Sequence, residues 1–465
     1  MWINNFLDLF GNFLYAYILI PLLIFAGVYF TFMTRFVQFR LLKDAFKALT
    51  EKADKGKVSS FKSLMISTAS KIGVGHIAGI ASAIIIGGPG SVFWMWIMAI
   101  LGSASAFIES TLAQIYKVKD ENGGFRGGPA YYMQKVFNKK WLGVLFSCLL
   151  IAGYAYGFNA LQSFQLSSAL TPYIEDYKSG IYPMIVGFIL AAVTALAIWG
   201  GTHRVGFISA YVVPVMSLAY ISLSVYIGIK NFDKIPEVFS TIFKEAFNFK
   251  AIFGAMFYKS ALMMGTKRGL FSNEAGMGSS PNAAATADVL HPVNQGLAQI
   301  LSVFIDTLLI CSATSFIVLL SGVDFCCGLE DIPLVQEAVR NQVGTFGVHL
   351  IAFSIFAFAF TSIIGNYSYA ETNVLFIKNS KVLLNIFRVT CVITVFLGAQ
   401  ADAKTVWNIS DLLMGLMAVV NTVVILLIGN IAIKALKDYL AQKKKGQTPV
   451  FVAKNVGIEN TDVWN

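Results

Sequence analysis

Two apolar stretches of this chain are each interrupted by a short glycine-rich segment, and one interruption opens each half of the sequence. The first covers residues 67–79 and reads STASKIGVGHIAG, and the second covers residues 265–279 and reads GTKRGLFSNEAGMGS. Glycine permits the backbone angles that a helix break requires. Backbone groups unpaired at membrane depth are tolerated only inside protein or beside a water-filled cavity. Paired breaks in corresponding halves therefore indicate the substrate site of a transporter.

The composition places the rest of the chain in a membrane. Of 465 residues, 56% are hydrophobic and 13% are charged, against about 25% charged residues in soluble domains. This excludes a soluble two-domain protein and predicts an all-α membrane protein. Eleven apolar segments approach or exceed the ~20 residues that cross a bilayer as a helix. They lie at about 11–33, 61–86, 90–116, 141–170, 181–200, 205–229, 250–284 (broken), 294–321, 346–376, 382–400 and 405–435.

The net charge of +10 is best explained by membrane topology. Its lysines and arginines cluster at residues 35–57, 117–140 and 443–445, and Lys267 and Arg268 are counted on the same side. The positive-inside rule then places the N-terminus outside and the C-terminus in the cytoplasm of a multi-pass protein of the inner (plasma) membrane. No nucleic-acid partner is expected. The first apolar run lacks a preceding basic region and a small-residue cleavage site, so it is expected to remain as a helix.

The predicted orientation divides the chain into two five-helix halves of opposite topology, which is an inverted repeat. We expect a single transporter domain over residues 1–440, followed by a cytoplasmic tail at 441–465. Within the domain, 11–33 is a peripheral helix, 61–229 is the first repeat and 250–438 is the second. Residues 34–60 form either an amphipathic helix on the inner membrane surface or a solvated linker.

Several motifs resemble the alanine or glycine:cation symporter family, also called sodium:alanine symporters or amino acid carrier proteins. They are GGPGSVFWMW at 87–96, RGLFSNEAGMGS at 268–279, FIDT at 304–307 and DLLMGLMA at 411–418. The resemblance covers roughly residues 10–440. It implies a leucine-transporter-type fold of about 11 transmembrane helices, a 5+5 inverted repeat with one extra N-terminal helix. It also implies sodium coupling and a small neutral amino acid as substrate.

The first break is the expected substrate site. Amides freed at Gly73, Val74 and Gly75, with the positive end of the following half-helix, suit a substrate carboxylate, and His76 is a further candidate for substrate binding. The alternative is that these glycines only allow close helix packing. Gln162 matches a family glutamine that faces the cavity, although a structural interhelical bond explains it equally well.

A sodium site follows from the fold analogy. The resemblance implies an ion between the broken helix and the ninth span, bound by the carbonyls of Ala69 and Ile72 and the hydroxyls of Thr361 and Ser362. Hydroxyl and carbonyl oxygens suit a hard cation. Alternatively, these hydroxyls bond back to their own helix, as serine and threonine commonly do in membrane spans.

The chain departs from the family at the expected site. The usual Gly-Thr-Gly-Asn is here Gly73-Val74-Gly75-His76, and Asn366, a further candidate for substrate binding, replaces a common tryptophan. We hypothesise that a proton on His76 replaces one sodium ion, which would give proton or mixed coupling. The alternative is a neutral imidazole bonded to unwound backbone.

Charged residues inside the spans are functional candidates by default. Glu109 and Asp411 fall near predicted helix ends, which favours a structural role. For Asp306 and Glu371 the sequence does not decide between a structural and a functional role. Lys259 either extends toward the membrane surface or approaches the cavity.

The sequence thus predicts a secondary active symporter that imports alanine or glycine with Na⁺ by alternating access. Serine or glutamine, with H⁺ in place of or beside Na⁺, is the alternative. A membrane enzyme is disfavoured because the sequence has no HExxH, no GxSxG and no paired nucleophile and base within one span. A channel is disfavoured because the sequence has no charged rings or repeated filter motif. No organic cofactor is expected.

Overall fold

The computed structural model describes residues 2–51, 53–54, 57–121, 123–199, 202–248, 257–325 and 328–464. The predicted start of the second repeat at residue 250 lies outside them. Nine described helices are long and apolar enough to span a membrane, or ten with the bent pair Ser60–Lys71 and Val74–Gly87 counted as one. The seventh predicted span, 250–284, is represented by two shorter described helices. The all-helical membrane class is confirmed, and the chain is a multi-pass membrane protein.

The first half of the chain supplies the N-terminal helix, the first break and the long helices around it. In order, its elements are α1 (Trp2–Phe13), η1 (Leu14–Leu19), α2 (Ile20–Met33), α3 (Val37–Arg40), α4 (Leu42–Leu49), α5 (Ser60–Lys71), η2 (Val74–His76), α6 (Ala78–Gly87), α7 (Ser91–Ile115), β1 (Val118–Lys119), β2 (Phe125–Arg126), α8 (Pro129–Phe137), α9 (Lys140–Leu150), η3 (Ile151–Phe158), α10 (Asn159–Ser168), η4 (Thr171–Tyr173), α11 (Tyr182–Trp199) and α12 (Thr202–Lys230). The two strands form an antiparallel hairpin that pairs Val118 with Arg126.

The second half supplies the second break and the helices that enclose it. Its elements are η5 (Phe232–Lys234), α13 (Ile235–Ala246), η6 (Phe257–Lys259), α15 (Ala261–Asn273), α16 (Ser280–Ala284), α17 (Pro292–Val303), η7 (Phe304–Cys311), α18 (Ser312–Leu320), α19 (Asp331–Val343), α20 (Thr345–Ile377), α21 (Lys381–Gly398), α22 (Ala403–Lys444) and η8 (Ala453–Val456). The π-helical segments η3 and η7 each lie inside a longer continuous helix.

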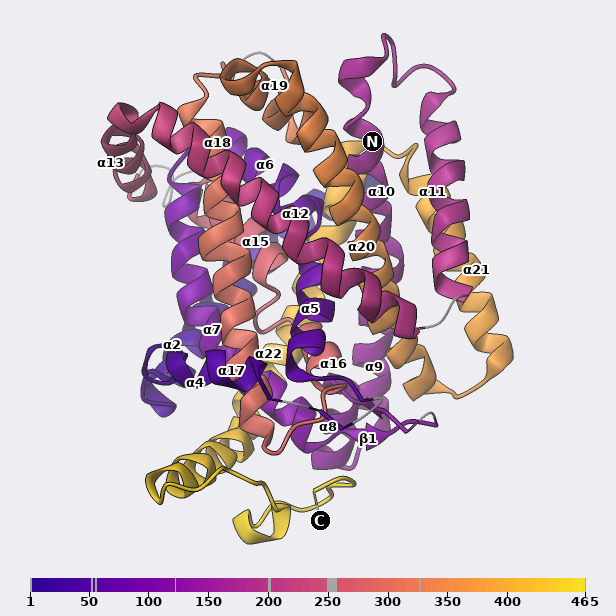
Figure 1. Ribbon diagram of the computed structural model, residues 1–465. Helices are drawn as coiled ribbons and strands as arrows, with labels where there is room; N and C mark the ends of the chain where they lie inside the picture. Colours follow the sequence, from indigo (N-terminus) through magenta and orange to yellow (C-terminus); the bar gives the residue numbers. More distant parts are fainter. Residues whose placement is uncertain are drawn as a thin grey trace.

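The helices form a bundle with two distinct ends (Figure 1). Helices α13 and α19 lie at one end, which we call the α19 face. Helix α8, the β-hairpin and the C-terminal residues lie at the other, which we call the tail face. Helices α5, α7, α15, α17 and α20 pack together in the centre, whereas α11 and α21 pair at the periphery. Peripheral side chains such as Phe188 and Leu196 are exposed, as expected for a surface that faces lipid.

The segment between α2 and α5 is an amphipathic helix that packs against the bundle. Its small residues Ala45 and Ala48 are buried, and α4 contacts α17. The aromatic side chains of Phe36, Phe39 and Phe46 are exposed on the other side. The segment is therefore helical and packed against the bundle, and its place on the membrane surface stays a prediction.

Candidate functional site

The first break separates α5 from α6 in the centre of the bundle. Helix α5 ends at Lys71, because Ile72 adopts ψ 75° and Gly73 is extended with φ −117° and ψ −157°. One 3-10 turn, Val74–His76, precedes α6, and the two helices meet at 64°. All residues from 67 to 84 are buried. The break therefore places helix-terminal backbone groups and the positive end of α6 inside the protein.

Gln162 of α10 approaches this break from the side. Its Oε1 accepts a hydrogen bond from the Val74 amide at 3.0 Å. A Cβ atom on Gly73 would lie 2.5 Å from Gln162 Nε2 and 2.5 Å from Ser362 Oγ. Glycine is thus required at position 73 for the two side chains to reach the break. The structure brings Gly73, Val74 and Gln162 together.

The four residues expected to bind sodium lie on α5 and α20. Ser362 Oγ donates to the carbonyl of Ala69 at 2.9 Å, so two of the expected ligands are adjacent. The carbonyl of Ile72 leaves the helical direction because of its ψ of 75°. The Thr361 hydroxyl donates to two carbonyls of the preceding turn of its own helix, at 3.0 and 3.1 Å. The Thr361 hydroxyl is therefore bonded back to its own helix, which is the alternative interpretation given by the sequence. Its oxygen can still act as an acceptor or ligand.

Asn366 lies one turn beyond Ser362 on α20. Its Oδ1 accepts from Ser70 Oγ at 2.7 Å, and its Nδ2 donates to Asn159 Oδ1 at 3.0 Å. Asn366 thus links α5, α10 and α20 immediately before the break, and its role in substrate binding stays a prediction.

His76 points away from Gln162, toward the second half of the chain. Its Nε2 lies 3.0 Å from Ser272 Oγ, which is also 3.2 Å from Thr307 Oγ1 and 3.0 Å from Cys311 Sγ. Its Nδ1 is buried without a hydrogen-bond partner among the described residues. The partner of this imidazole is therefore a hydroxyl, which can pair with either protonation state of histidine, and the proton on His76 stays a prediction.

The second break lies between α15 and α16, and a carboxylate from α7 holds it. Glu109 accepts from the amides of Gly276 and Gly278, each at 3.1 Å, and from Asn421 Nδ2 at 2.7 Å. Glu274, at the start of the break, accepts from two serine hydroxyls. Glu109 thereby satisfies backbone groups that the break leaves unpaired, in agreement with a structural role.

An ion pair and aromatic rings cover the first break on the side of the α19 face. Arg268 of α15 donates to both oxygens of Asp411 on α22, at 2.8 and 3.3 Å. Its guanidinium lies 3.8 Å from the ring centroid of Trp407, and Trp407 Nε1 donates to Asp331 at 3.0 Å. Below them, the Phe271 ring contacts Trp407, with centroids 5.5 Å apart. We call Arg268, Asp411, Trp407 and Phe271 the outer cluster.

The sequence placed Lys267 and Arg268 on the same side of the membrane as the basic tail, and this prediction is wrong. Asp411 lies near the start of α22, whereas the lysines at 443–445 lie at its other end. Both basic side chains belong to helix α15 and are buried. Counting charges could not detect this, because it treats a paired charge inside a helix as a loop charge.

A second buried ion pair lies beside the first break. Lys71 Nζ is 3.6 Å from Asp306 Oδ2, and both side chains are fully buried. The ammonium also donates to Ser302 Oγ at 3.0 Å, and this hydroxyl donates to Asp306 Oδ2 at 2.9 Å. Asp306, left open by the sequence, thus faces a lysine of the broken helix.

The two other charged residues left open are Glu371 and Lys259. Glu371 pairs with Arg388 of α21 at 3.1 Å and accepts from the Tyr367 hydroxyl, which gives it a structural role between α20 and α21. Lys259 is exposed in η6, just before α15.

The C-terminal residues fold back onto the tail face. Trp464 Nε1 donates to the carbonyl of Gln114 at 2.7 Å, and its ring lies 4.9 Å from Lys117 Nζ. Lys117 in turn donates to the carbonyl of Ala287 at 2.7 Å, and residue 287 pairs with Val58 just before α5. Burial lowers the pKa of Lys117 to about 7. The tail therefore contacts Lys117, which donates to the residue that pairs with Val58 just before α5.

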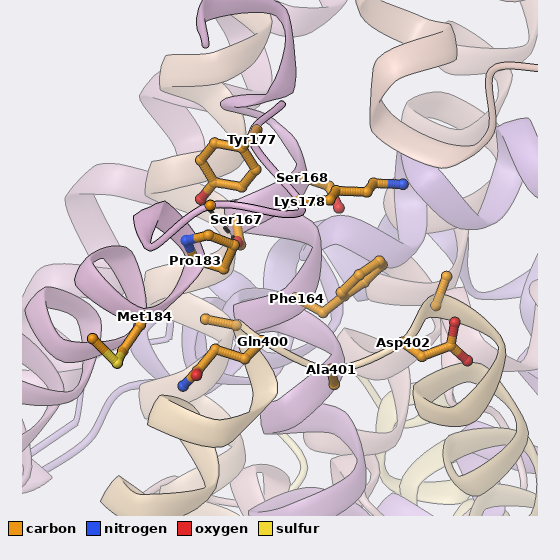
Figure 2. Close-up of a pocket in the computed structure, with 13 residues that line it drawn as sticks. Phe164, Ser167, Ser168, Tyr177, Lys178, Pro183, Met184, Gln400, Ala401 and Asp402 are labelled. Atoms are coloured by element: carbon orange, nitrogen blue, oxygen red, sulfur yellow. Dashed lines mark hydrogen bonds between the residues drawn. The ribbon is translucent and has the colours of Figure 1, made fainter. Parts of the chain in front are cut away.

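A cavity of about 300 Å³ lies apart from the break, at the ends of α10 and α21 (Figure 2). Phe164, Tyr177, Lys178 and Asp402 are among its lining residues. None of the residues predicted to bind substrate or sodium lines it.

Sequence reasoning missed the outer cluster and the partner of Lys71. The signal available for both was a lone charge inside an apolar segment, which marks functional candidates. The partner of each charge lies far away in the sequence and was not identifiable.

The comparisons with known proteins agree with the motifs. Residues 1–453 match the model of the sodium:alanine symporter family. The chain is 43% identical to amino-acid carrier protein AlsT of Bacillus subtilis, covering 99% of this chain and 97% of the relative. It is 45% identical to the probable sodium/glutamine symporter GlnT of the same organism, covering 95% and 91%. It is 34% identical to the sodium/alanine symporter AgcS of Methanococcus maripaludis, covering 92% and 95%.

Among solved structures, the chain is similar to a Na⁺-coupled sialic acid symporter in a substrate-bound outward-open state. The TM-score is 0.51 at 13% sequence identity, over 92% of this chain and 86% of the other. At this identity the similarity concerns the fold alone.

Proposed function

The chain belongs to the sodium:alanine symporter family, and from this premise we propose that it imports alanine or glycine together with Na⁺ by alternating access. Family membership supports Na⁺-coupled amino acid symport and a transporter rather than an enzyme. The preferred amino acid, the site residues and the mechanism are our proposal.

The observation that carries the proposal is the juxtaposition at the first break. There, Gln162 bonds the Val74 amide while Ser362 bonds the Ala69 carbonyl. We propose that Na⁺ binds between the carbonyls of Ala69 and Ile72 and the hydroxyls of Thr361 and Ser362. Carbonyl and hydroxyl oxygens are ligands that a hard cation prefers.

The amides of Gly73 and His76 already donate to the carbonyls of Lys71 and Gly73, so we propose that the substrate carboxylate binds the amides of Val74 and Gly75 at the positive end of α6. Gln162 already accepts from one of these amides, so it would rotate to donate its Nε2 to the carboxylate when substrate enters. Asn366 would act indirectly, by fixing Ser70 and hence the end of α5. Transport of an amino acid zwitterion requires no covalent chemistry. It requires groups in the site that match the two charges of the substrate.

The outer cluster supports a small side chain as the preferred substrate. The Phe271 ring would collide with a Cβ atom on Gly75, so it lies directly against the break. Phe158 adds a second ring, with its centroid 4.9 Å from that of Phe271. Because these rings lie directly against the break, we propose that they select a small side chain such as that of alanine or glycine, and that serine and glutamine are less favoured because they are larger.

Alternating access would use the two ends of the broken helix. We propose that the outer cluster closes the α19 face, and that the contacts of residue 287 with Val58 and Lys117 close the tail face. We propose that the tail face is cytoplasmic in the plasma membrane, with the N-terminus outside. We also propose that residues 61–229 and 250–438 are the two inverted repeats of a 5+5 fold within the domain 1–440.

The test is uptake into liposomes with purified protein and labelled alanine, glycine, serine and glutamine. Na⁺ and H⁺ gradients are imposed independently. We expect alanine or glycine to accumulate under an inward Na⁺ gradient alone. Accumulation driven only by H⁺ would instead support the proton-coupled alternative, and no accumulation under either gradient would refute symport.

A further inference from the structure

The least expected group in the membrane interior is the ammonium of Lys71. It lies immediately before the break, and its side chain is fully buried. Burying a charge costs several kcal/mol unless it is paired. Here the cation is placed within the residues that bind substrate and ion under the proposed function, where a fixed charge affects every other charge.

The oxygens around this ammonium form a set that a metal cation would also use. Asp306 Oδ2 lies 3.6 Å from Nζ, and Ser302 Oγ lies 3.0 Å from it. Thr68 Oγ1 is 3.4 Å from Ser302 Oγ. These are one carboxylate and two hydroxyls, which are hard oxygen ligands. Two come from η7 and α17 and one from α5, so the cation joins the broken helix to the second half.

One atom of this group lacks a partner. Asp306 Oδ1 is buried and has no hydrogen-bond partner among the described residues. By contrast, Glu109 has backbone amides and Glu274 has serine hydroxyls as donors. Asp306 is thus the carboxylate whose charge depends on the cation beside it.

We propose that Lys71 is a tethered cation that occupies, with Asp306, a second cation site of this transporter. The ammonium substitutes for a mobile ion there, and Na⁺ binds only at Ser362. This inference rests on the proposed Na⁺ symport and sets its stoichiometry: the chain carries one positive charge fewer per amino acid than it would without Lys71.

The test removes the tethered charge and counts the charges that move. Lys71→Ala frees the volume of the ammonium beside Asp306, Ser302 and Thr68. The reversal potential of labelled alanine flux in proteoliposomes gives the charge carried per amino acid. We expect Lys71→Ala to carry one more positive charge than the wild type, with a steeper dependence of uptake on Na⁺ concentration.

Two further variants serve as matched controls. Lys71→Arg keeps the tethered charge and should keep the wild-type charge ratio. Lys71→Ala combined with Asp306→Asn removes both charges and should return the ratio to that of the wild type. An unchanged ratio in Lys71→Ala, with the protein folded and active, would overturn the proposal.

A binding measurement covers the case in which Lys71→Ala no longer transports. Ligand that binds only the folded state raises the melting temperature, and a second bound ion makes the dependence on log Na⁺ roughly twofold steeper. A slope in Lys71→Ala equal to that of the wild type overturns the proposal. If wild-type uptake is not driven by Na⁺, the proposed function fails, which is a different result from an unchanged slope.

Discussion

Replacing Ser362 with alanine tests the sodium site where the structure is most specific. The Ser362 hydroxyl lies 2.9 Å from the carbonyl of Ala69 and is fully buried. If both oxygens bind Na⁺, the change removes one uncharged ligand of a cation. Interactions with charged groups are worth about 1.5–3 kcal/mol. The Na⁺ concentration for half-maximal uptake should then rise by about tenfold or more, since ~1.4 kcal/mol corresponds to a factor of ten.

The assay measures initial rates of labelled alanine uptake over a range of Na⁺ concentrations at constant ionic strength. Ser354→Ala is the matched control, because Ser354 is also buried on α20 and its hydroxyl donates to the carbonyl of Leu350 on its own helix. We expect Ser354→Ala to leave the Na⁺ dependence unchanged. Thr361→Ala should raise the half-maximal concentration less than Ser362→Ala, because its hydroxyl bonds its own helix. Equal Na⁺ dependence in Ser362→Ala and the wild type would refute this site.

The remaining predictions concern the outer cluster, the break and the tail. Asp411→Asn leaves the buried Arg268 guanidinium unpaired, so uptake should fall by at least an order of magnitude; normal uptake by the folded variant would contradict a gating role. Gly75→Ala should abolish uptake in folded protein, because its Cβ would collide with an aromatic ring of α15, and a normal alanine affinity would contradict this. Burial lowers the pKa of Lys117 to about 7, below the ~10.4 of an exposed lysine. The docked tail then binds fewer protons than the released tail between these values, so docking should strengthen as pH rises from about 7 and be weakest below it. Hydrogen exchange of residues 451–464, corrected for intrinsic rates, checks this; the pH trend should vanish in Lys117→Met, and a trend that persists there would refute the assignment.

The residues expected at the first break from the sequence lie close together in the structure. The glycines at 73 and 75 are local signals, because a glycine-rich interruption of an apolar run is visible without knowing which helices pack around it. Gln162 and Ser362 came from the resemblance to a family, and both contact the break. Their roles in binding stay predictions.

His76 shows where local reasoning was insufficient. The sequence suggested a proton on this imidazole, because it replaces a family asparagine. The structure turns its Nε2 toward Ser272 and places a second basic side chain, Lys71, beside the break; the proton on His76 stays a prediction. Which of two neighbouring residues faces the substrate depends on the direction of each side chain, and the helix break sets that direction.

The sequence by itself determined the membrane class, the family, the two breaks and the amphipathic helix, because hydrophobicity and glycine act locally along the chain. Only the tertiary structure decided which charges meet. Lys71 pairs with Asp306, and Arg268 pairs with Asp411, although more than a hundred residues separate the partners in the sequence. A buried charge is stable only with its partner, and that partner is selected by how the helices pack. The same packing folds the C-terminal residues onto Lys117, which composition had predicted only as a cytoplasmic tail.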